Sequence, residues 1–188
     1  MLEYILPFSI YILTGFLKGT YALIIKFIVC SIIIAFFWKK YKLRTYTSYI
    51  SILTGLVIAI LWIVLTPKYQ IASFIPSDYL SLIFKIMNFV FIAPIIEELI
   101  TRSFIPRILI NSDYEKIPVG SMNLSSFILS TVFFTIAHKQ WIAAAVVSVI
   151  LNLLLLKTKR IESVITGHFV ANVFLVLYII MTNSWNLW

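Results

Sequence analysis

The chain has 188 residues, of which 62% are hydrophobic, 16% aromatic and only 12% charged. This composition excludes an ordinary soluble globular domain and predicts a single all-α, polytopic transmembrane bundle over residues 1–188, with no soluble domain of useful size. The formal net charge of +8 comes from bases that mostly lie between apolar runs, so we interpret them as topology signals and contacts with the lipid bilayer, and not as a nucleic-acid site.

Apolar runs follow one another along the chain at lengths near the ~20 residues that a membrane-spanning helix needs. We expect about seven helices, at roughly 4–17, 21–38, 46–65, 80–106, 124–138, 141–156 and 162–181. The runs at 124–138 and 141–156 are short for full crossings. The polar turn HKQW between them is therefore predicted to lie within the membrane, covered by protein or by a wet cavity.

The basic residues predict the topology of the bundle. Three connectors are rich in lysine and arginine, KKYKLR at 39–44, RILINSDYEK at 107–116 and KTKR at 157–160, whereas the alternate connectors hold only Lys18, Lys68 and Lys139. Positive-inside counting places the basic connectors and the N-terminus in the cytoplasm. The start of the chain lacks the basic region and cleavage site of a signal peptide and is expected to be the first membrane helix. Cys30 lies in an apolar run and is expected to serve packing.

Ionisable residues inside apolar runs mark a candidate functional site. Of seven acidic residues only Glu97 and Glu98 interrupt an apolar run, and both histidines, His138 and His168, lie within or at the edge of one. An ionisable group at membrane depth costs ~2.5 kcal/mol or more, so its presence indicates a partner and a task. Four such groups in one small bundle favour a site over packing.

The double glutamate has a helical spacing to a cation. Glu98 precedes Arg102 by four residues, the favourable order for an ion pair within a helix. Glu97 points about 100° away on the same helix and is left available for chemistry. A glutamate of this kind can act as a general base on water. The alternative is that Glu98 and Arg102 form a purely structural pair.

The same spacing of four recurs twice more, at Phe134 with His138 and at His168 with Asn172. The aromatic ring could orient the first imidazole, which could share the water. His168 and Asn172 could donate hydrogen bonds to the oxyanion formed when an amide is attacked. This set suffices for peptide hydrolysis without a covalent nucleophile. Asn172 alone is equally explained as an interhelical hydrogen-bonding residue.

The segments EELITR, FTIAH and HFVAN match, in order, the motifs EExxxR, FxxxH and HxxxN. In this the chain resembles the CPBP family, which comprises the CAAX prenyl endopeptidases and their bacterial relatives, also called Abi proteins. The resemblance covers a motif-bearing core at 80–181, after variable N-terminal helices at 1–79. DYEKIPVGS, NLLLLKT and NSWNLW further resemble the CAAX prenyl protease-related branch that accompanies exosortase-type sorting systems in bacteria.

The resemblance implies an intramembrane endopeptidase of the bacterial inner membrane, with a protein or peptide substrate that includes a C-terminal sorting segment. It makes Glu97 the base and His138 its partner, with His168 and Asn172 as oxyanion stabilisers and Glu98, Arg102 and Phe134 in support. It also offers a zinc site at Glu97, His138 and His168. We favour a mechanism without cofactor, because HExxH is absent and Asn172 is a poor zinc ligand.

Two other classes of function stay open at this stage. One is a non-proteolytic scaffold or immunity-type protein of the same fold. The other is a small ion-coupled transporter, since buried Glu, His and Arg also mark ion relays, although the chain shows no internal repeat.

Overall fold

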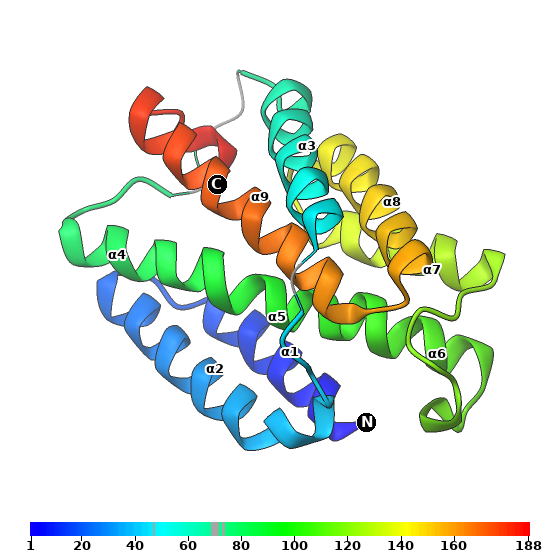
Figure 1. Cartoon of the computed structure of the whole chain (residues 1–188). Helices are drawn as coiled ribbons and strands as arrows, with labels where there is room; N and C mark the ends of the chain where they lie inside the picture. Colours follow the sequence, from blue (N-terminus) through cyan, green and yellow to red (C-terminus); the bar gives the residue numbers. More distant parts are fainter. Residues whose placement is uncertain (47, 69–71, 73) are drawn as a thin grey trace.

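The computed structural model describes residues 1–46, 48–68, 72 and 74–188, and its regular structure in these ranges is entirely helical. Within these described ranges seven helical rods follow one another, which confirms the predicted all-α membrane bundle (Figure 1). They are α1 (Leu2–Gly15), α2 (Thr20–Tyr41), α3 (Tyr49–Leu65), one rod joining α4 (Tyr79–Met87), η1 (Asn88–Ile92), α5 (Ala93–Glu98), η2 (Leu99–Phe104) and α6 (Ile105–Ile110), then α7 (Leu124–Ile136), α8 (Trp141–Thr158) and α9 (Ile161–Thr182). Short 3₁₀ turns lie at η3 (Tyr114–Lys116) and η4 (Trp185–Leu187).

Four of these rods are long and apolar enough to cross a membrane: α2, Tyr79–Ile110, α8 and α9. Large apolar side chains on their outer faces are exposed, Phe36 by 80% and Met181 by 82%. Such surface is tolerated only against lipid or a partner, so it supports an integral membrane protein. Within the run predicted at 46–65, helix α3 begins at Tyr49, capped by the Ser48 hydroxyl, and Thr47 lies outside the described residues.

The connectors sort to two ends of the bundle. Glu3, Lys42, Arg107 and Lys159, which come from four separate parts of the chain, line one cavity at the first end. At the other end the Thr20 hydroxyl donates to Asp78. The turn after α7 is joined to the C-terminal segment by one hydrogen bond, from Gln140 Nε2 to the carbonyl oxygen of Asn186. Alternation of this kind is what a series of antiparallel rods produces.

The longest rod, green in Figure 1, spans Tyr79–Ile110 and contains two π-helical stretches. In each, a proline stands where the π pattern needs an N–H. Ala93 N–H bonds Asn88 O, so the carbonyl of Phe89 would next be bonded by residue 94, which is proline. The carbonyl is taken instead by a side chain from another helix. Glu97 and Glu98 lie between the two π-helical stretches, and Arg102 lies within the second.

Helix α7 is short. Its 13 residues rise about 20 Å, against a hydrocarbon core of roughly 30 Å, so the turn that follows it cannot reach the far surface. The side chain of Asn123 caps its start by accepting from Ser126 N–H, and the helix ends at Ile136. His138 therefore lies in the turn between α7 and α8.

Helices α3 and α9 cross closely because small residues face each other. A Cβ atom on Gly55 would lie 2.5 Å from the backbone oxygen of Gly167. Ser51 and Ala59, one turn before and after, are also buried. Close approach over small residues is typical of packing between membrane helices. This crossing fixes α9, and with it His168 and Asn172, against the rest of the bundle.

Candidate active site

Glu97 and Glu98 leave the long rod in different directions, as their helical spacing predicts. The side chain of Glu98 is fully buried, whereas that of Glu97 keeps 15% of its surface exposed and lines a cavity. Adjacent carboxylates are thereby separated into one held in the protein interior and one open to a small internal space.

Glu98 binds two partners. Its Oε2 lies 3.2 Å from Nε of Arg102 in a buried ion pair, and its Oε1 accepts from His168 Nδ1 at 2.7 Å. The predicted Glu98–Arg102 pair is present, but the contact with His168 on α9 has no counterpart in the sequence pattern. Because Nδ1 donates to a carboxylate, the ring is held with Nε2 as the nitrogen left for other partners.

Arg102 is fixed on every side. Its guanidinium donates to Thr101 Oγ1 at 2.7 Å and to Ser148 Oγ at 2.8 Å, and its Cζ lies 4.2 Å from the centroid of the Phe134 ring. A planar guanidinium combines such stacking with several hydrogen bonds, which an ammonium group cannot do. Arg102 therefore positions Glu98 and also supports the aromatic ring that precedes His138.

His138 faces Glu97. Its Nδ1 donates to the carbonyl oxygen of Phe134 at 2.7 Å, and its ring lies 4.3 Å from the Phe134 ring between centroids. Its Nε2 lies 3.8 Å from Glu97 Oε2, too far for a direct hydrogen bond. Glu97 Oε2 is buried and accepts no hydrogen bond from any described residue. The two groups thus converge on a space that suits a water molecule held by both.

Asn172 has a structural bond as well as a place in the cavity. Its Nδ2 donates to the carbonyl oxygen of Phe89 at 2.7 Å, the group that Pro94 leaves without a partner. The second π stretch has the same arrangement. Residue 106 is proline and cannot donate to the Thr101 carbonyl, which instead accepts a hydrogen bond from Ser130 Oγ at 2.7 Å. Asn172 therefore does join two helices, α9 and the long rod, as the sequence allowed. Its second amide N–H is left for other partners.

A cavity of about 210 Å³ joins these groups. Its polar lining includes Glu97, His138, His168 and Asn172, and Phe134 lies among the apolar residues around them. Glu98 and Arg102 lie behind this lining and contact it through His168 and Phe134. The rest of the wall is mostly apolar, with residues from α1, α3 and α8 as well as the motif-bearing helices.

Three contributors to the site carry no signal in the sequence. Tyr11 of α1 donates to Glu97 Oε1 at 3.4 Å, and the ammonium of Lys26 lies 3.5 Å from the centre of the Tyr11 ring. Ser148 of α8 holds Arg102. These side chains lie in apolar runs where a single tyrosine, lysine or serine is also compatible with packing, so only the fold reveals their place.

The alternative zinc set does not fit this arrangement. Glu97, His138 and His168 do not form a group of three potential metal ligands, and no such group occurs in the described part of the chain. His168 Nδ1 is already bound to the Glu98 carboxylate, so that nitrogen is not available to a metal.

The fold and the cavity define a helical membrane protein with a carboxylate–imidazole site between its helices. A comparison with protein families matches residues 78–174 to the family described as Type II CAAX prenyl endopeptidase Rce1-like. The chain belongs to this family, which confirms the predicted relationship to CAAX-type proteases. Searches of curated proteins and of solved structures gave no match.

Proposed function

We propose that the protein is an intramembrane endopeptidase in which Glu97 activates water for attack on a peptide bond. The observation that carries the proposal is the pairing of a buried Glu97 Oε2, free of any described donor, with the imidazole of His138 at 3.8 Å. The family is one of CAAX-type proteases, which supports the reaction type.

The proposed step transfers a proton from water to Glu97 while the water oxygen bonds to the carbonyl carbon of the substrate. His138 orients the water, because its Nδ1 proton is held by Phe134 O and its Nε2 faces Glu97. Collapse of the tetrahedral intermediate breaks the C–N bond, and the proton on Glu97 passes to the leaving amine. Water is consumed and both carboxylate and amine products form without a covalent enzyme intermediate.

His168 and Asn172 are placed to stabilise the oxyanion. With Nδ1 bound to Glu98, the imidazolium form of His168 presents Nε2–H toward the cavity. Asn172 adds the amide N–H that Phe89 O does not use. Donors aimed at developing charge in a water-poor site are usually the largest single contribution to such catalysis. Glu98 and Arg102 act as positioning residues, since they hold His168 and the Phe134 ring.

The substrate is proposed to be a membrane protein cut near a C-terminal membrane segment, in the bacterial inner membrane with the basic end of the bundle in the cytoplasm. The cavity lies among membrane helices and is walled mainly by apolar side chains, so a peptide must arrive from within or beside the bilayer. No metal is required in this proposal, and a chelator should leave the activity unchanged.

The test compares protein termini in membranes from cells that express the wild type, Glu97→Gln or Asp113→Asn. Asp113 is an exposed carboxylate in the α6–α7 connector, so its amide variant matches the chemical change outside the site. New termini should appear with the wild type and Asp113→Asn and be absent with Glu97→Gln. Identical termini in all three would support a scaffold-type protein and reject the protease.

A further inference from the structure

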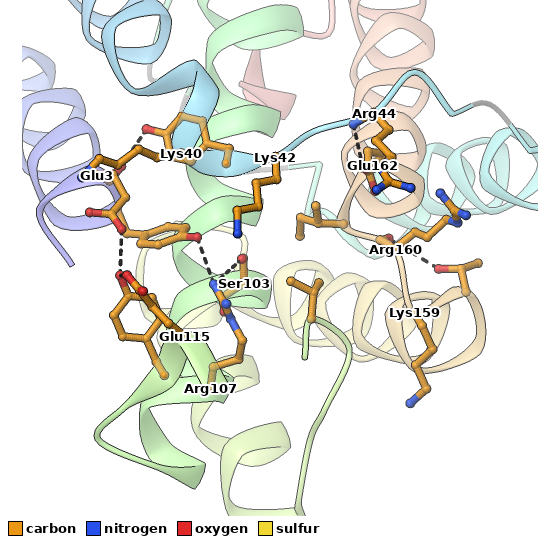
Figure 2. Close-up of a pocket in the computed structure, with 16 residues that line it drawn as sticks. Glu3, Lys40, Lys42, Arg44, Ser103, Arg107, Glu115, Lys159, Arg160 and Glu162 are labelled. Atoms are coloured by element: carbon orange, nitrogen blue, oxygen red, sulfur yellow. Dashed lines mark hydrogen bonds between the residues drawn. The ribbon is translucent and has the colours of Figure 1, made fainter. Parts of the chain in front are cut away.

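A second and larger cavity, of about 750 Å³, opens at the end of the bundle where the basic connectors meet. It is separate from the candidate active site, because Arg107 follows Glu97 by ten residues, roughly 15 Å along the rod at 1.5 Å per residue. Six cationic side chains line it, together with three acidic ones (Figure 2). The cationic residues are Lys40, Lys42, Arg44, Arg107, Lys159 and Arg160, and the acidic residues are Glu3, Glu115 and Glu162.

Arg107 is the buried cation of this cavity, with 7% of its surface exposed. Its Nε donates to Ser103 O, and its Nη2 donates to Tyr4 Oη and to Ser103 Oγ, each at 2.9 Å. Its Nη1 has no hydrogen-bond partner among the described residues. The guanidinium is therefore fixed in place by neutral groups, while its charge has no counter-ion and one of its nitrogens is left for a ligand.

The acidic side chains of the cavity are engaged with other donors. Glu3 Oε1 accepts from Tyr114 Oη at 2.7 Å, and Glu115 Oε1 lies 3.2 Å from the same hydroxyl. Glu162 Oε1 accepts the backbone N–H of Arg44 at 2.8 Å. In the described part of the chain no carboxylate oxygen lies within 4.0 Å of any of the six cationic groups. None of these six cations is therefore held in an ion pair with a described carboxylate, and the lining carries three more cationic than acidic side chains.

Lys42 completes the arrangement from the opposite wall. It has a left-handed backbone conformation (φ 53°) at the C-terminus of α2, which turns the chain across the mouth of the cavity. Figure 2 shows its side chain directed toward Ser103 and Arg107, whereas Lys159 points away. Lys159 instead donates to Gly120 O at 2.9 Å. Lys42 and Arg107 thus line the same cavity, with the Lys42 side chain directed toward Arg107.

We propose that this cavity binds a phosphoryl group, as a phosphate monoester or diester. A guanidinium with a free edge and a facing ammonium are the groups that recognise phosphate oxygens, and an anion would relieve the repulsion among the gathered cations. The cavity lies at the end of the bundle where the basic connectors meet, the end that the sequence predicts to be cytoplasmic. An anionic phospholipid headgroup and a soluble phosphate share this chemistry, and both can reach the site.

The test measures binding to the full-length protein in uncharged detergent by calorimetry. Short-chain phosphatidylglycerol, short-chain diacylglycerol, which carries no phosphate, and inorganic phosphate serve as probes. Arg107→Gln should weaken binding of the anionic probes at least tenfold, since it removes a hydrogen bond to a charged group. Lys42→Gln replaces an exposed side chain and keeps the test valid if Arg107→Gln does not fold. It should weaken binding about threefold or more, and the affinity should fall as salt rises.

Lys157→Gln is the matched control, because Lys157 is exposed at the same end of α8 and does not line the cavity. Its affinity should stay within twofold of the wild type. Binding of phosphatidylglycerol without inorganic phosphate would identify a lipid headgroup as the source, and binding of both would identify the phosphoryl group itself as sufficient. Equal binding of diacylglycerol and phosphatidylglycerol with no binding of phosphate, or equal losses in the Lys42 and Lys157 variants, would overturn the proposal.

Discussion

Replacement of Glu98 by glutamine tests how the buried acid supports the site. The change keeps the size of the side chain but removes the charge that faces Arg102 at 3.2 Å and His168 at 2.7 Å. Both Glu98 and Arg102 have 0% side-chain exposure, so water cannot screen the loss. Removal of one partner of a buried pair costs about 3–5 kcal/mol, because the other charge is left buried alone.

For a chain of this length, each kcal/mol corresponds to a shift in Tm of about 2–4 °C, so Glu98→Gln should lower Tm by roughly 6–20 °C. The single cysteine provides the assay. Cys30 is 0% exposed in the folded protein, so a thiol-reactive fluorescent dye labels it only on unfolding. Melting curves in detergent then compare the variants directly.

The double variant Glu98→Gln/Arg102→Met gives the matched control. It removes the unpaired cation and should recover part of the lost Tm, although proteolysis should stay low because His168 has lost its carboxylate partner. A Tm for Glu98→Gln within about 2 °C of the wild type would refute the reasoning that the buried charges depend on each other.

Three further variants test a helix contact and two hydrogen bonds in and around the site. Gly55→Ala places a Cβ 2.5 Å from a carbonyl oxygen of α9, so it should destabilise by about 1–3 kcal/mol in the dye assay, whereas Gly15→Ala, whose Cβ has its nearest neighbour at 3.7 Å, should not. Tyr11→Phe removes the donor to Glu97 and, if the proposed mechanism holds, should lower kcat about 2–10-fold with little change in Tm; an unchanged kcat would remove this residue from the site. Ser130→Ala leaves the Thr101 carbonyl buried without its partner and should cost about 1–3 kcal/mol, and a Tm equal to that of the wild type would show that the π stretch needs no such support.

The sequence predicted the helices and the spacing of the site residues because both depend on local periodicity. Glu98 with Arg102 is an example, since a separation of four residues within one helix determines that the two side chains meet. The short α7 was also predictable, because its apolar run is too short to cross the bilayer. These features need no knowledge of which helices are neighbours.

The remaining features depend on tertiary packing. The contact of Glu98 with His168 spans 70 positions, and that of Tyr11 with Glu97 spans 86. The two prolines of the long rod are visible in the sequence, but the π stretches that they accompany depend on side chains from α7 and α9 that take over the orphaned carbonyls. The cationic cavity likewise forms only when connectors far apart in the sequence reach the same end of the bundle.

The central claim is that Glu97 activates the water that cleaves the substrate. The most direct measurement is the single-turnover rate of peptide cleavage in vesicles by the wild type, Glu97→Gln and Asp113→Asn, on a substrate found by the comparison of termini. Loss of a general base lowers the rate by about 10²–10⁴-fold, so Glu97→Gln should fall by that factor while Asp113→Asn stays near the wild type. A Glu97→Gln enzyme that keeps more than half of the wild-type rate would contradict the account.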